Sequence, residues 1–81
     1  MKKVRIIIPA AEKEIDIECN EQAFVRDIMQ DIRNLLEKKG ETITGEEEQY
    51  VLCKVKDGCI LEQNKPLGFY QIVDGESFFY L

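Results

Sequence analysis

The chain has 81 residues, and its 11 Lys and Arg against 16 Asp and Glu give a formal net charge of −5. Hydrophobic residues make up 44% and charged residues 33%, a globular composition that excludes the collagen-like and disordered classes. We therefore predict a single domain over residues 1–81. The acidic balance argues against nucleic-acid binding, and no apolar stretch approaches the roughly 20 residues of a membrane span, so we expect no direct membrane insertion.

The sequence contains no His, which removes the usual general base and the commonest zinc-binding nitrogen. Three Cys remain, at Cys19, Cys53 and Cys59, without a CxxC pair. Secreted proteins that depend on disulfides favour an even number of Cys, so we expect reduced thiols and a cytoplasmic location. We expect no catalytic residue, no metal ligand and no cofactor, and hence no enzyme.

The first two elements are predicted strands over residues 4–8 and 14–19, joined through a short turn after Pro9. Alternation places successive side chains on opposite faces of a strand. The side chains expected to face inward are Val4, Ile6, Ile8, Ile15, Ile17 and Cys19, with Arg5, Ile7 and the acidic residues on the other face.

A helix is predicted from about Phe24 to Lys39, with Asn20 as its N-cap and Gly40 as its stop. Apolar residues alternate at spacings of three and four, which predicts one buried stripe. The stripe consists of Val25, Ile28, Met29, Ile32, Leu35 and Leu36, and the opposite polar face includes Arg33.

Residues 41–49 form a predicted acidic loop around Glu46–Glu48, either simply solvated or able to dock a basic partner. A third strand over 50–55 and a short one over 59–61 flank an Asp57-Gly58 turn. If that turn is a two-residue loop, Lys56 faces Cys59, and Cys53 and Cys59 lie on opposite faces of the sheet. A helical turn over 67–72 and an Asp74-Gly75 turn then precede the last strand, 77–81.

One amphipathic helix can cover only one face of a sheet. The order of elements therefore predicts an α+β fold: a mixed sheet of four to five strands with one helix packed on one face. If the first and last strands pair in parallel with the helix as crossover, the fold is a β-grasp.

The segment 61–72, LEQNKPLGFYQI, resembles the stretch of ubiquitin between its short fourth strand and its fifth. Leu67, Ile72, the Asp74-Gly75 turn and the terminal strand 78–81 also resemble the bacterial YukD/EsaB family of ubiquitin-like proteins, which are encoded beside type VII (Esx) secretion machinery. This resemblance implies a cytosolic accessory or regulator of type VII secretion that acts through protein partners.

The C-terminus differs from that of ubiquitin-like proteins that are conjugated to other molecules. Ubiquitin-like modifiers and sulfur carriers end in a flexible tail that closes with Gly-Gly, whereas this sequence stops at Tyr80-Leu81. If the chain is full length, conjugation and sulfur carriage are not expected. Two alternatives stay open: a modifier or sulfur-carrier relative without its tail, and a ubiquitin-like fragment of a larger secretion component.

The sheet face away from the helix is the candidate binding surface. In a β-grasp, Phe79 and Leu81 of the last strand lie beside Arg5 and Ile7 of the first strand. Lys54 and Lys56 border them on the other side if Val51, Cys53 and Val55 point inward. The resemblance implies that Phe79 and Leu81 match positions of ubiquitin's recognition patch. We expect a protein-binding patch, with a weak homodimer contact or an idle apolar surface as the alternatives.

Overall fold

The computed structural model describes residues 1–40 and 50–81. The predicted acidic loop, with Glu46–Glu48, lies outside the described residues. The elements are β1 (Lys2–Ile8), η1 (Pro9–Ala11), β2 (Lys13–Cys19), α1 (Val25–Lys38), β3 (Leu52–Lys54), β4 (Ile60–Leu61), η3 (Leu67–Tyr70) and β5 (Ser77–Tyr80). Among these residues, no helix is both long and apolar enough to cross a membrane.

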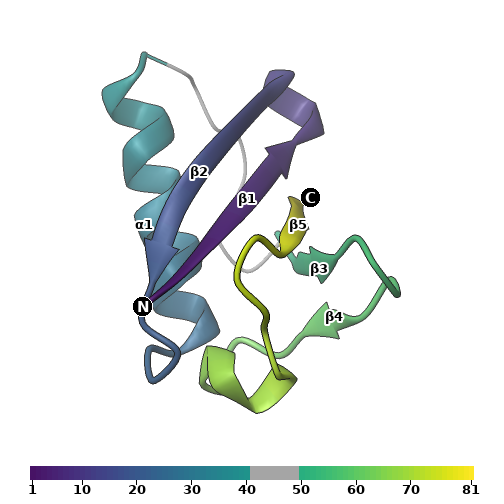
Figure 1. Ribbon diagram of the computed structural model, residues 1–81. Coiled ribbons are helices and arrows are strands. Elements are labelled where there is room, and N and C mark those ends of the chain that lie inside the picture. Colours follow the sequence, from purple (N-terminus) through teal and green to yellow (C-terminus); the bar gives the residue numbers. More distant parts are fainter. Residues whose placement is uncertain (41–49) are drawn as a thin grey trace.

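The strands form one mixed sheet in the order β2-β1-β5-β3-β4. β1 and β5 run parallel, and the other neighbouring pairs are antiparallel. Figure 1 shows α1 on one side of the sheet, with β5 ending between β1 and β3. The predicted α+β architecture is confirmed, including the parallel pairing of the first and last strands with the helix in the crossover between them.

The core lies between the sheet and α1, where alternation in β1, β2 and β5 gives the expected inward residues. Val4, Ile6 and Ile8 are at most 2% exposed. Phe78 and Tyr80 are likewise buried, and the ring of Tyr80 stacks on that of Tyr50 with centroids 4.8 Å apart. The strands therefore hold one apolar face against the helix, and their other face is left uncovered by it.

The helical stripe is buried as predicted except at Leu35, which is 36% exposed. Arg33, predicted on the polar face, is instead buried, with its guanidinium 5.2 Å from the centre of the Tyr50 ring. An Arg can occupy such a position because its aliphatic stem packs on apolar surface and its planar head stacks on an aromatic face.

The N-terminus of α1 corrects the prediction for Asn20. The helix begins at Val25, and the Asn20 side chain accepts from the amide of Gln22 in a turn that precedes it. The first helical amides donate to a distant segment instead: Val25 to the carbonyl of Lys65 and Arg26 to that of Gln63. Backbone carbonyls from residues 63–65 thus replace the expected side-chain cap.

The register of β3 is opposite to the one assumed from sequence. Leu52 is 1% exposed and pairs with buried Tyr80, whereas Cys53 pairs with Phe79. Leu52 therefore faces α1, and Cys53 faces away from it with Val51 and Val55. The cause is cross-strand packing, because Leu52 fills the core position opposite Tyr80.

The turn between β3 and β4 is longer than the predicted two-residue loop. Cys53 pairs with Ile60, and the amide of Lys54 donates to the carbonyl of Cys59, so Lys54 rather than Lys56 faces Cys59. Cys53 and Cys59 still lie on opposite faces, and all three cysteines are free.

Candidate functional site

Apolar side chains gather on the sheet face that α1 leaves uncovered. We call this surface the outer sheet face. It consists of Ile7 (β1), Phe79 (β5), Cys53 (β3) and Ile60 (β4), with Val51 and Leu81 beside them. Ile60 and Leu81 are 60% and 51% exposed, and the other four are half-buried. These side chains are available to a partner.

The register places four of these residues in one row across the sheet. Ile7 pairs with Phe79, Phe79 with Cys53, and Cys53 with Ile60. Val51 and Leu81 exchange backbone hydrogen bonds of 2.9 and 3.0 Å, which places them side by side next to this row. Because neighbouring strands lie about 4.8 Å apart, the row forms a continuous apolar strip about 15 Å long.

The charged border of this face differs from the predicted one. Arg5 lies beside the strip as expected, and its Nε donates to Asp16 Oδ1 over 3.1 Å. That hydrogen bond, followed by the charges of Asp16 and Glu14, raises the pKa of Arg5. Glu14 faces Ile7 across the β1–β2 pair, so the β2 side of the face is acidic.

Lys54 and Lys56 do not form the expected basic border. Lys54 pairs with Phe78 on the helix side of the sheet, and its Nζ donates to the carbonyl of Tyr70 over 2.9 Å. Lys56 lies in the turn after β3. The structure therefore brings Ile7, Phe79, Leu81 and Arg5 together on one face and places Lys54 on the other.

Sequence reasoning missed Val51, Cys53 and Ile60 as members of the outer sheet face. Both parities of residues 50–55 contain apolar side chains, so alternation alone gives no direction for this strand. The lysine at position 54 was a misleading signal, because an interior-side lysine at a strand end can reach a carbonyl with its long stem.

The buried thiol of Cys19 lies on the other side of the sheet. Burial, and after it the negative charge of Asp31, raise the pKa of Cys19 to about 11. The thiolate is the reactive form of cysteine, so this group is a poor nucleophile near neutral pH. Among the described residues, no group of three or more His, Cys, Asp or Glu side chains is placed to hold a metal ion.

We predict that iodoacetamide at pH 8 modifies Cys19 at least about tenfold more slowly than Cys53 or Cys59 in the folded protein, since its thiolate is scarce and its side chain inaccessible. Cys19 is 4% exposed, whereas the other two side chains are half-buried at the surface. Timed alkylation followed by peptide mass spectrometry measures the three rates. The difference should vanish in denaturant, and equal rates in the folded protein would contradict the prediction.

Comparison with known proteins confirms the fold. No family model matches the sequence, and no curated protein matches it. The structure resembles the ubiquitin-like domain of an Arabidopsis thaliana protein solved by NMR in solution, with a TM-score of 0.75 and 15% sequence identity, over 99% of this chain and 74% of the other. The protein has a ubiquitin-like β-grasp fold.

Proposed function

We propose that this chain is a protein-interaction module that binds a partner through the outer sheet face. The observation that carries the proposal is the apolar row Ile7–Phe79–Cys53–Ile60, which crosses four strands on the face that α1 leaves uncovered. Exposed apolar strips of this kind are typical of interaction sites. Apolar side chains of this kind bind a partner by being buried against it. We therefore propose a binding role for the module and not an enzymatic one.

We further propose that the partner belongs to bacterial type VII secretion and that the module acts in the cytoplasm. This part rests on the resemblance of Leu67, Ile72, Asp74-Gly75 and the terminal strand to the YukD/EsaB family. Three free thiols are compatible with a reducing compartment. The fold itself is used for many functions, so the secretion assignment depends on that sequence motif and on experiment.

The test is affinity capture from the native cytosol, with the double variant Phe79→Ser/Leu81→Ser against the wild type. Phe69→Ser is the matched control, because Phe69 is 61% exposed but lies on η3, away from the outer sheet face. We expect the double variant to lose at least about tenfold of the specific capture, as for loss of an aromatic anchor, and the control to retain it. Circular dichroism checks that all variants fold.

The outcomes separate the two parts of the proposal. Secretion components that are captured by the wild type and the control, and lost in the double variant, support both parts. A specific partner unrelated to secretion, lost in the same variant, supports the outer sheet face and overturns the secretion assignment. Capture that is unchanged in the double variant overturns the outer sheet face as the site.

A further inference from the structure

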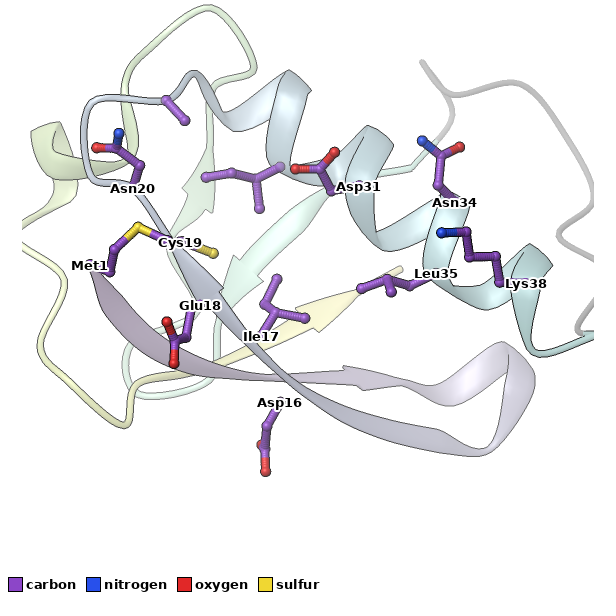
Figure 2. A pocket seen from close by; sticks show the side chains of 12 residues that line it. Met1, Asp16, Ile17, Glu18, Cys19, Asn20, Asp31, Asn34, Leu35 and Lys38 are labelled. Carbon is purple, nitrogen blue, oxygen red and sulfur yellow. The ribbon is translucent and has the colours of Figure 1, made fainter.

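A second surface lies between α1 and β2, the strand at one edge of the sheet. A groove of about 680 Å³ runs there, and its apolar lining includes Ile17, Ala23, Ile28 and Leu35. Figure 2 shows Ile17 on β2 and Leu35 on α1 projecting into the space between the two elements. Leu35, which is more exposed than the predicted buried stripe required, thus forms part of the groove wall.

The groove runs along an edge of the sheet, because β2 is the end strand and, in the part of the chain that the structure describes, no further strand pairs with it. In β1 the amide of Arg5 donates to Glu76 and the carbonyl of Lys3 accepts from Gly75, so odd-numbered residues of β1 bond toward β5. Even-numbered residues of β1 therefore bond toward β2, where they pair with its odd-numbered residues.

The same geometry fixes which backbone groups of β2 face outward. The amides and carbonyls of Glu14, Asp16 and Glu18 point away from β1, and within residues 1–40 and 50–81 no backbone or side-chain hydrogen bond reaches them. Every second residue of β2 thus offers a donor and an acceptor. Such an edge is a template for pairing with another extended chain.

The charges along this edge disfavour a second copy of the same protein. The side chains of Glu14, Asp16 and Glu18 all lie on one face of β2, and among residues 1–40 and 50–81 Asp16 of this row forms a salt bridge with Arg5. Pairing β2 with the β2 of another copy would set carboxylates opposite carboxylates, which destabilises a strand pair. A strand with basic residues on that face would complement them.

The two faces of β2 also dictate the pattern of the incoming strand. Side chains on its groove side would meet Ile17 and Leu35, and those on its other side would meet the carboxylates. Acidic groups outnumber basic ones around the groove, where Asp16, Glu18 and Asp31 stand against Lys38. The complementary sequence therefore alternates apolar and basic residues.

We propose that the free edge of β2 and the β2–α1 groove bind an extended segment of a partner protein in which apolar and basic residues alternate. The segment adds a sixth strand to the five-stranded sheet. Its backbone pairs with Glu14, Asp16 and Glu18, its apolar side chains enter the groove, and its basic side chains face the carboxylates. The carboxylates of this surface border the outer sheet face, where Glu14 faces Ile7, but the groove and the outward backbone groups lie beyond it at the β2 edge.

The probe is the capped peptide Val-Lys-Val-Lys-Val-Lys, titrated into isotope-labelled protein and followed by NMR. The controls are a peptide of the same composition in block order, Val-Val-Val-Lys-Lys-Lys, and one with Glu in place of Lys. We expect the alternating basic peptide to bind at least about tenfold more tightly than either control, with the affinity falling as salt rises. Contacts between peptide protons and the β2 amides are expected in the wild type.

Two substitutions at one position separate backbone pairing from charge. Asp16→Pro removes the central outward amide without removing a β1–β2 hydrogen bond, whereas Asp16→Ala removes the same charge and keeps the amide. We expect the Pro variant to weaken peptide binding at least about tenfold and the Ala variant only about two- to fivefold. Leu35→Ser should weaken it as well.

Several results would overturn this proposal. They are equal binding by the Pro and Ala variants, equal binding of the alternating and block peptides, or wild-type shifts centred on Phe79 instead of β2. The wild-type NMR contacts decide the question even if Asp16→Pro fails to fold. Phe79→Ser/Leu81→Ser should leave peptide binding unchanged, so failure of this inference is distinguishable from failure of the proposed function.

Discussion

Replacing Phe78 with alanine is expected to lower the free energy of unfolding by about 3–5 kcal/mol, whereas the same change at Phe79 should cost about 1 kcal/mol. The two residues are neighbours in β5, but Phe78 is 1% exposed beneath α1 and Phe79 is half-buried on the outer sheet face. A chain of this length has a total stability of about 4–12 kcal/mol, so the loss at Phe78 is a large fraction of it.

Urea unfolding followed by circular dichroism measures both values, and partner capture gives the second readout. Phe79→Ala is expected to fold normally and to lose capture. Phe78→Ala should retain capture in whatever fraction of the protein stays folded, since its side chain does not reach the outer sheet face. Equal losses of stability would mean that the two side chains do not lie on opposite faces. The assignment of Phe79 to the outer sheet face would then be wrong.

Alternation predicted the faces of β1 and β5 but not of β3. In β1 the apolar residues Val4, Ile6 and Ile8 contrast with Arg5 on the other parity, so burying the apolar set decides the orientation. Residues 50–55 carry apolar groups on both parities, and the orientation follows from pairing with β5. That pairing joins segments far apart in the sequence, and no local pattern contains it.

The residues of the candidate site were predicted correctly only on the strands whose orientation was predicted correctly. Phe79, Leu81 and Ile7 were placed correctly on the outer sheet face because β1 and β5 were placed correctly. Lys54 was placed on the wrong face because the assumed register of β3 was wrong. Ile60 went unnoticed for the same reason, since its position depends on its pairing with Cys53.

The helix cap shows a similar limit of local rules. Asn20 has the residue type of an N-cap, but it lies in a separate turn, and the helical N-cap position is held by Phe24 without a side-chain hydrogen bond. The segment before η3 supplies the acceptors instead, and it is itself held by the amides of Leu67 and Gly68, which donate to Ala23 and Glu21. The start of α1 and residues 62–70 therefore stabilise each other.

We expect Leu67→Ala to lower the free energy of unfolding by about 2–5 kcal/mol, because the side chain is 1% exposed and its loss leaves a cavity. The same change should loosen the segment that carries the carbonyls of Gln63 and Lys65. Amide hydrogen exchange at Val25 and Arg26 should therefore become faster than at the middle of α1, beyond the change expected from global stability alone.

Asn20→Ala is the matched control for this mechanism. If the distant carbonyls cap the helix, this variant should lose at most about 1 kcal/mol, the worth of one turn hydrogen bond, and exchange at Val25 and Arg26 should stay slow. Faster exchange at those two amides in Asn20→Ala, with no such change in Leu67→Ala, would contradict this mechanism and show that Asn20 stabilises the start of the helix. The expected opposite pattern would show that the start of α1 is stabilised by contacts with a segment about 40 residues away.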